Sequence, residues 1–164
     1  MFTGIIIHLG KVRNKSENSL RIKTDKELIN SLSKGASIAV DGICLTVVYL
    51  RGDNFSVDYM PETKKKTNIK YMQNGSLVNL ELPATANSLL SGHIVQGHID
   101  GVAKLETITP EGNSYILKFS IPKDLSKYIV EKGSIAVNGI SWASSDSKAG
   151  ARYPCPIASW SATV

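Results

Sequence analysis

The chain has 164 residues and a mass of 17.7 kDa, which is enough for one ordinary domain or two small ones. With 42% hydrophobic and 20% charged residues, its composition excludes wholesale disorder, a collagen-like fibre and a disulfide-stapled miniprotein. The net charge of +5 arises from 19 basic residues scattered among 14 acidic ones, so we interpret it as a solubility feature and expect no nucleic acid partner.

Short stretches rich in β-branched residues, separated by Gly, Asn and Asp, predict β-strands through the first half of the chain. We expect these strands at residues 3–7, 20–22, 37–40, 45–50, 55–59 and 77–82. The sequence RGDN at 51–54 is typical of a hairpin turn. One short helix is predicted at 25–32, with Thr24 as its N-cap. This density of short strands predicts a small closed Greek-key barrel, because closure removes exposed strand edges.

The second half of the chain repeats the first. The sequence KGASIAVDGIC at 34–44 recurs as KGSIAVNGIS at 132–141, with Cys44 replaced by Ser141. Upstream, Gly4 recurs as Gly97, and a second helix is predicted at 121–130 with Pro122 in its first turn. We therefore interpret the chain as a tandem duplication, with one unit at 1–90 and the other at 91–164.

Two histidines in SGHIVQGHIDG, at 91–101, are candidates for proton transfer because imidazole titrates near neutrality. His93 and His98 are five residues apart on an expected strand, so they should point to opposite faces and not share a metal ion. A surface or capped histidine is the alternative for each. The sequence has no P-loop, dinucleotide fingerprint or metalloprotease motif, and we expect neither a metal nor a cofactor.

A strand at 41–47 would place Cys44 and Thr46 on one face, where the thiol lines a pocket or, alternatively, is an inert buried side chain. The basic run at 64–66 lacks interleaved aromatic residues and is interpreted as a solvated face. Cys44 and Cys155 have no metal-binding spacing, and the start MFTGIII has no features of a secretory signal. With no apolar run long enough to span a membrane, these features predict a reduced, cytoplasmic setting.

Six stretches together resemble riboflavin synthase of the alpha-chain type, which has two lumazine-binding repeats. They are MFTGII, GASIAVDGICLTVV, PETKKKTN, GSLVNLE, GHIVQGHIDG and GSIAVNGIS, and the resemblance covers residues 1–141. It implies an all-β fold of tandem six-stranded Greek-key barrels. The implied activity is a cofactor-free dismutation of two 6,7-dimethyl-8-ribityllumazine molecules to riboflavin and 5-amino-6-ribitylamino-uracil. A homotrimer tied together by a C-terminal helix is also implied, as is association with lumazine synthase.

The same resemblance suggests which residues form the site. The polar candidates for catalysis are His98, Cys44 and Ser37, with Phe2 packing near the substrate, and their individual roles as base, nucleophile or positioning group stay open. The implied substrate-binding residues are Gly4, Ile5, Ile6, Cys44, Leu45, Thr46, Asp58, Tyr59, Met60, Pro61, Glu62, Thr63, Gly97, His98 and Ile99. Lys132 and Ser141 would line the pocket of the second unit.

The residues after Ser141 depart from the family pattern. Where Leu-Thr-Val and further strands are expected, 142–164 reads WASSDSKAGARYPCPIASWSATV and holds both tryptophans of the chain. The change predicts an incomplete second barrel, and we interpret it as an altered reading frame or early stop, with a natural divergent tail as the alternative. Two functions stay open: riboflavin synthase, or a non-catalytic lumazine- or flavin-binding protein. The set Ser37, Cys44 and His98 favours the enzyme.

Overall fold

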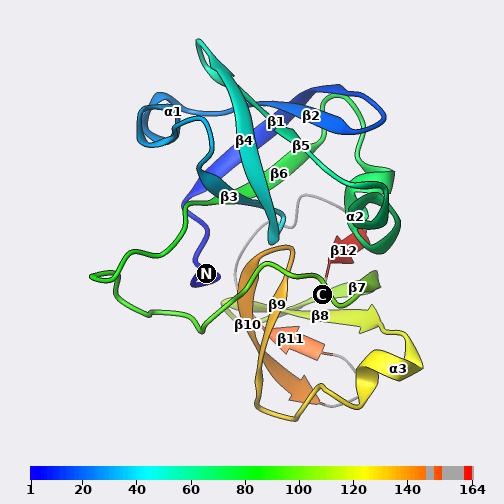
Figure 1. Cartoon of the computed structure of the whole chain (residues 1–164). Helices are drawn as coiled ribbons and strands as arrows, with labels where there is room; N and C mark the ends of the chain where they lie inside the picture. Colours follow the sequence, from blue (N-terminus) through cyan, green and yellow to red (C-terminus); the bar gives the residue numbers. More distant parts are fainter. Residues whose placement is uncertain (147–149, 153–160, 164) are drawn as a thin grey trace.

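The computed structural model describes residues 1–146, 150–152 and 161–163. Two β-sheet units lie one above the other, and the N-terminus lies between them (Figure 1). The first unit is a closed antiparallel barrel with the strand order β1-β2-β5-β4-β3-β6. Its strands are β1 (His8–Lys15), β2 (Ser19–Lys23), β3 (Ser37–Val40), β4 (Ile43–Arg51), β5 (Asn54–Asp58) and β6 (Leu77–Glu81). Its short helices are α1 (Lys26–Ser31), α2 (Pro61–Lys66) and the 3₁₀ turn η1 (Asn68–Tyr71). The predicted closed barrel and the hairpin turn at 51–54 are confirmed.

The core of the barrel follows from alternation along its strands. In β4, Ile43, Leu45 and Val47 are buried, whereas the residues between them are more exposed. Phe55 and Val57 of β5 are fully buried in the same cluster. Because the side chains of a strand alternate between its two faces, this pattern fixes which residues remain on the outer surface of the barrel.

Helix α1 begins one residue later than expected, and the predicted cap is wrong. Asp25 is the N-cap, and its carboxylate accepts a hydrogen bond from the backbone N–H of Leu28 at 2.8 Å. The hydroxyl of Thr24 instead donates to the carbonyl of Leu9 at 2.9 Å. A carboxylate is the better partner for the free N–H groups of a first turn, where it also faces the positive end of the helix dipole.

The second unit contains a six-stranded sheet with the order β12-β7-β8-β11-β10-β9. Its elements are β7 (Val102–Glu111), β8 (Ser114–Ser120), α3 (Lys123–Ser126), β9 (Ser134–Val137), β10 (Ile140–Asp146), β11 (Gly150–Arg152) and β12 (Ser161–Thr163). With β12 in the place of β6, this order is that of the first barrel. The strands β10, β11 and β12 all draw on the divergent tail, so the sheet keeps six strands, whereas an incomplete second barrel was predicted and the described sheet is not closed.

The two sheets differ in closure. In the first unit β3 pairs with β6, through Ala39 opposite Glu81. The corresponding pairing of β9 with β12 does not occur among the described residues of the second unit. Two smaller expectations also change: the helix predicted at 121–130 is only the four residues of α3, and the strand predicted at 3–7 is absent, since β1 starts at His8.

The described part of the chain contains no helix with the length and apolar character needed to cross a membrane.

Candidate functional site

In each unit, the segment that precedes the first strand crosses over and packs against the other unit. Residues 2–6 lie against the second unit, where the carbonyl of Gly4 accepts a hydrogen bond from the N–H of Ser141 at 2.8 Å. Residues 95–99 lie against the first unit, where the carbonyl of Gly97 accepts from the N–H of Cys44 at 3.0 Å. Because Gly4 matches Gly97 and Cys44 matches Ser141 in the repeat, one contact is made twice, related by an approximate two-fold axis.

The crossing explains why no strand forms at 3–7 or at 91–101. The crossing segments form only the single bridge of Phe2 with Val95, so the expectation that His93 and His98 share a strand is wrong. Their apolar side chains enter the opposite core: Ile6 packs against the second unit and Ile99 against the first. These segments therefore do not pair with the sheet of their own unit. They join the two units instead.

Glycine is required where the segments cross. A Cβ atom on Gly97 would lie 2.7 Å from the Cβ of Cys44, and one on Gly4 would lie 2.8 Å from the Cβ of Ser141. Both glycines also have positive φ angles, of +81° and +77°. The close approach brings the backbone of each segment directly over the thiol or hydroxyl position of the other unit.

An apolar cluster fills the junction beside these contacts. It consists of buried Phe2, Ala39 and Val95, with Cys44 and Ala136 packed against it. Phe2 is only 1% exposed, so its ring fills the junction. The ring also lies close to Gly97, since a Cβ added there would be 3.0 Å from the edge of the ring.

A buried polar network joins the units at the same axis. The carboxylate of Asp41 accepts hydrogen bonds from the N–H of Asn79 at 2.8 Å and from the amide of Asn68 at 2.9 Å. The amide of Asn79 donates to the carbonyl of Asn138 at 3.0 Å. Burial raises the pKa of Asp41 to about 6, against the opposing effect of its hydrogen bonds. Asn138 occupies the position in the repeat that corresponds to Asp41, so these two equivalent positions hold one buried carboxylate instead of two that would repel each other.

The first candidate surface is the outer face of β3, β4 and β5. Ser37 lies opposite Thr46, which in turn lies opposite Asp58, so a row of polar side chains crosses three strands. Cys44 lies on the same face as Thr46, as predicted, because its two neighbours in β4 point into the core. The thiol of Cys44 is free and partly buried. The segment from Gly97 borders this face through its hydrogen bond to Cys44.

The loop after β5 and helix α2 extend this first surface. Met60, which precedes α2, is 71% exposed, and Pro61 and Thr63 belong to the helix. Glu62 forms an ion pair with Lys66 at 3.0 Å within the helix, and the hydrogen bond from Lys66 lowers the pKa of Glu62. This ion pair is solvent-exposed, so it contributes little to stability.

The second candidate surface surrounds Ser141. The Nδ1 atom of His93 and the hydroxyl of Ser141 are hydrogen-bonded at 2.7 Å. Burial lowers the pKa of His93, so its imidazole is neutral near pH 7. Gly92 lies beside this pair, since a Cβ there would be 3.1 Å from the Cβ of Ser141 and 2.1 Å from the carbonyl oxygen of Thr3. Ser141 therefore has the same place in the second unit as Cys44 has in the first, but with the imidazole of His93 beside it.

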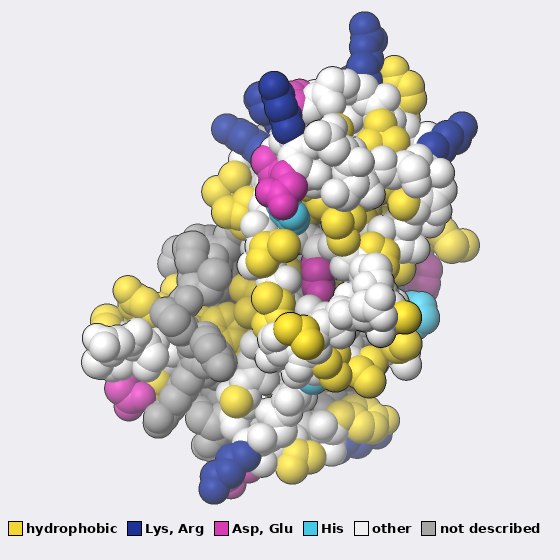
Figure 2. Space-filling model, turned by 90° about the vertical axis from the view of Figure 1, so that its left-hand side faces the viewer, with side chains coloured by type: hydrophobic (Ala, Val, Ile, Leu, Met, Phe, Trp, Pro, Cys, Tyr) yellow, Lys and Arg dark blue, Asp and Glu magenta, His cyan; other side chains and the backbone are white. Residues whose placement is uncertain are grey.

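A cavity of about 600 Å³ lies between the crossing segment 93–100, α3 and β9. Both His93 and His98 line it, together with Tyr128. The His98 side chain is exposed, and among the described residues it forms no hydrogen bond with Cys44 or Ser37. Hydrophobic side chains are concentrated around the middle of the molecule, whereas lysine and arginine side chains gather at the outer end of the first unit (Figure 2).

Sequence comparison identifies the family to which this doubled arrangement belongs. The Lumazine binding domain family matches residues 3–83 and again residues 96–151. Riboflavin synthase of Bacillus subtilis is 41% identical over 145 residues, which cover 86% of this chain and 67% of the relative. Riboflavin synthase of Actinobacillus pleuropneumoniae is 40% identical over 144 residues, with the same shares covered. The chain belongs to the riboflavin synthase family.

Solved structures agree with the riboflavin synthase family fold. The crystal structure of LumP complexed with riboflavin is 31% identical and has a TM-score of 0.82, covering 93% of this chain and 85% of LumP. LumP complexed with 6,7-dimethyl-8-(1'-D-ribityl) lumazine is 30% identical with a TM-score of 0.80 and the same coverage. These likenesses extend over both units.

The structure sorts the residues implied by resemblance to the riboflavin synthase family into two groups. Cys44, Thr46 and Asp58 lie with Gly97–Ile99 on the first unit, whereas Gly4–Ile6 lie with Ser141 on the second. The side chains of Leu45 and Tyr59 are buried in the barrel core, so only their backbone can face a ligand. Lys132 is exposed, and its N–H donates to the carbonyl of Ser144, away from Ser141 on β10.

Sequence reasoning missed the pairing of His93 with Ser141. The repeat gave the signal that Ser141 corresponds to Cys44, but it gave no indication of which histidine would meet it. The crossing of the segments, on which this contact depends, is a tertiary feature with no local sequence pattern.

Proposed function

We propose that the chain is a riboflavin synthase that converts two molecules of 6,7-dimethyl-8-ribityllumazine into riboflavin and 5-amino-6-ribitylamino-uracil. The observation that carries this proposal is the doubled site: the contact of Gly97 with Cys44 is repeated by Gly4 with Ser141. Two related surfaces suit a reaction whose two reactants are the same molecule. The transfer of a four-carbon fragment between them balances without any external oxidant or reductant.

We assign one lumazine to each unit, residues 1–90 and 91–164. On the first, the ring would lie on the outer face between Cys44, Thr46 and the segment Gly97–Ile99, with the loop from Asp58 to Thr63 beside it. Exposed backbone groups of these segments would bind the polar edge of the pyrimidine ring. On the second, Gly4–Ile6 and Ser141 would take the same part, with Lys132 further along the surface.

The chemistry requires the C7 methyl group of one lumazine to lose a proton and the other lumazine to accept a nucleophile. We assign the proton transfer to His98, whose imidazole is exposed beside Gly97. Cys44 and Ser37 supply a thiol and a hydroxyl on the same outer face of the first barrel. Phe2 holds the crossing segments together at the junction and so positions Gly97. Orientation of the two rings would provide much of the rate enhancement.

A complete active site, on this proposal, combines the first unit of one chain with the second unit of a neighbouring chain in a cytoplasmic homotrimer. Association with lumazine synthase would supply the substrate directly. The proposed assembly is supported by the placement of the two candidate surfaces on different units of the chain. Sedimentation of the purified chain would show a species three times the mass of the monomer.

A second candidate function is non-catalytic binding of a lumazine or flavin. It is favoured by the likeness to LumP, which has been solved with riboflavin and with a lumazine, and by the difference in closure between the two units. On this alternative the closed first barrel would bind one ligand, and no second ligand would be placed to react with it.

Steady-state formation of riboflavin by the purified chain separates the two functions. The enzyme should form riboflavin and lose at least about 100-fold in turnover in His98→Ala, by the usual contribution of a general acid or base. A matched His8→Ala control should retain turnover, because His8 pairs with Asp25 away from the site. Tight fluorescence-detected lumazine binding without any product would contradict the enzyme and support the binding protein.

A further inference from the structure

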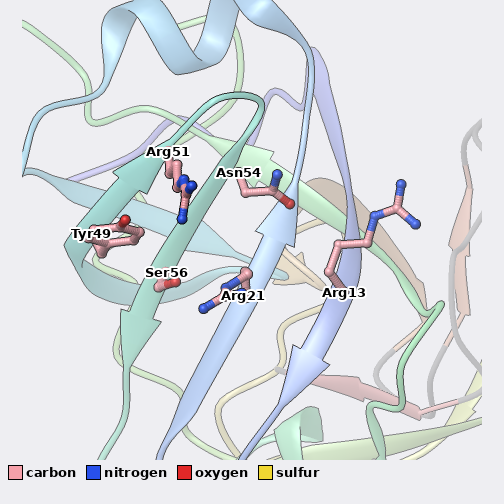
Figure 3. Close-up of a pocket in the computed structure, with 6 residues that line it drawn as sticks. All are labelled: Arg13, Arg21, Tyr49, Arg51, Asn54 and Ser56. Carbon is pink, nitrogen blue, oxygen red and sulfur yellow. The ribbon is translucent and has the colours of Figure 1, made fainter.

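A second cavity, of about 410 Å³, opens on the outer face of the first barrel away from the doubled site. It is lined by Arg13, Arg21, Tyr49, Arg51, Asn54 and Ser56. These side chains come from β1, β2, β4 and β5 and are drawn in Figure 3. The lining therefore combines three guanidinium groups with neutral hydrogen-bonding groups and contains no carboxylate.

Strand register places these groups next to one another. Arg21 of β2 lies directly opposite Ser56 of β5, and Ser56 lies opposite Tyr49 of β4. Two pairs further along, and therefore on the same face, Arg51 lies opposite Asn54. A β-bulge in β1 between Val12 and Asn14 leaves Arg13 as the additional residue of that strand. Bulges of this kind redirect a side chain, and here the bulge adds a third cation to the cavity.

The cations of this cavity lack internal partners. Within the described residues none of the three guanidinium groups forms an ion pair or a hydrogen bond. The carboxylate of Asp53 senses the charge of Arg13, but its ion pair is with Lys23 at 2.7 Å. Its pKa is lowered by the hydrogen bond from Lys23 and also, more weakly, by the charge of Arg13. Like charges gathered on neighbouring strands repel each other, so the bare arrangement is unfavourable.

The second unit provides an internal control, because it has the same bulge with different charges. Its bulge lies between Leu105 and Thr107, which makes Glu106 the counterpart of Arg13. Thr107 lies opposite Lys118, just as Asn14 lies opposite Arg21. Glu106 and Lys118 form an ion pair at 3.8 Å. The duplicate therefore neutralises this position internally, whereas the first unit leaves two positive charges for an external anion.

We propose that this cavity binds the phosphate group of a small phosphorylated molecule. Guanidinium groups bind phosphate oxygens through paired N–H donors. The Ser56 hydroxyl and the second N–H of the Asn54 amide, whose first N–H donates to Asp53, add neutral donors beside them. Tyr49 is half exposed and offers a ring face to the remainder of the ligand. The cavity volume is that of a small-molecule site. The proposal is independent of the reaction at the doubled site.

The test is calorimetric titration of the full chain with inorganic phosphate and with ribose 5-phosphate, using ribose as the unphosphorylated control. The double variant Arg13→Glu/Arg21→Lys copies the ion pair of the second unit and should weaken binding of both phosphates by at least about tenfold. The control Lys26→Ala removes an exposed charge from α1 and should bind like the natural chain.

Three results would overturn the proposal: no binding of either phosphate at millimolar concentration, equal weakening in Lys26→Ala, or full binding by the double variant. An affinity for an oligonucleotide that exceeds that for ribose 5-phosphate and falls steeply with salt would also overturn it, in favour of a polyanion surface. Thermal denaturation should give the double variant a Tm at or above that of the natural chain, so loss of binding cannot be attributed to unfolding.

Discussion

The two units of this chain have the same strand order but carry different residues at equivalent positions. At the axis between them, the first unit supplies Asp41 and the second supplies Asn138. At the equivalent bulges the first has Arg13 and the second Glu106. A duplicated fold thus keeps its backbone plan while its charges diverge, and the positions that differ indicate where each copy has a separate task.

The largest expected effect comes from the glycines at the axis. A Cβ on Gly42 would lie 2.7 Å from the backbone N of Gly139, at a φ of +81°. We expect Gly42→Ala to reduce the free energy of unfolding by about 3 to 5 kcal/mol, because backbone on both sides must shift. Urea denaturation measures this change. Gly139→Ala should behave alike, since its Cβ would lie 2.7 Å from the N of Gly42.

The matched control for the axis is Gly52→Ala in the β4–β5 hairpin. Gly52 also has a positive φ, of +59°, but no atom lies within 4 Å of an added Cβ. Gly52→Ala should lower the free energy of unfolding by only about 1 kcal/mol, which is the cost of the left-handed conformation alone. Equal losses at Gly42 and Gly52 would mean that the close contact between the units is unimportant for stability.

The buried carboxylate at the axis predicts a pH dependence of intermediate size. The pKa of Asp41 is raised from 3.8 to about 6 in the folded chain, so the folded state binds the proton more tightly than the unfolded state does. Stability from this group is therefore full below pH 4 and declines as the pH rises to 6, by about 3 kcal/mol in total. Denaturation midpoints measured across this range should fall accordingly.

Asp41→Asn should remove this decline, since it makes the first unit resemble the second at Asn138. The amide nitrogen of Asn68 faces position 41 at 2.9 Å, so once the Asn68 amide turns over, its Oδ1 atom, which is buried without a hydrogen-bond partner in the described structure, can accept from the new amide. The control Asp58→Asn changes an exposed carboxylate and should leave the slope between pH 4 and 6 intact. A variant at Asp41 that retains the natural slope would assign the titration to another group.

The smallest expected effect compares the helices of the two units. Asp25 caps α1 with its carboxylate, whereas α3 begins after Pro122 without a side-chain cap. Asp25→Ala should therefore lower the free energy of unfolding by about 1 kcal/mol. Asp124→Ala, in the first turn of α3, should have a smaller effect, which thermal denaturation of both variants would measure. Equal losses would show that capping does not distinguish the units.

Local sequence patterns predicted the strands of the first barrel because alternation and turn residues determine them directly. Ser37–Val40 is an example, and its residues form β3 as expected. The pattern of 142–164 predicted lost strands, yet backbone pairing with β7 and β8 forms β11 and β12. Strand pairing uses backbone groups that every sequence other than proline carries, so composition is a weak guide to it.

The sequence predicted which side chains share one face of a strand in the candidate site. It did not predict which segments of the two units come together there. Cys44 and Thr46 share a face because side chains alternate along any strand. By contrast, a segment that pairs with another unit has no distinguishing periodicity. The sequence Thr3–Ile7 has strand propensity, but its neighbours at Ser141 and Glu81 are far away along the chain. Such contacts depend on the tertiary fold, and so do the two groups into which the site residues separate.

The exchange of segments also has a consequence for the order of folding. The N-terminal residues are synthesised first, yet Gly4 hydrogen-bonds to Ser141 near the other end of the chain. During synthesis the first barrel can form from β1 to β6, and Glu81 of β6 can already accept hydrogen bonds from the N–H groups of Thr3 and Gly4. The contact of Gly4 with Ser141 needs the second unit as well. Contacts between such distant residues form late, because the intervening chain must be ordered first. The doubled site is therefore complete only once both units have formed.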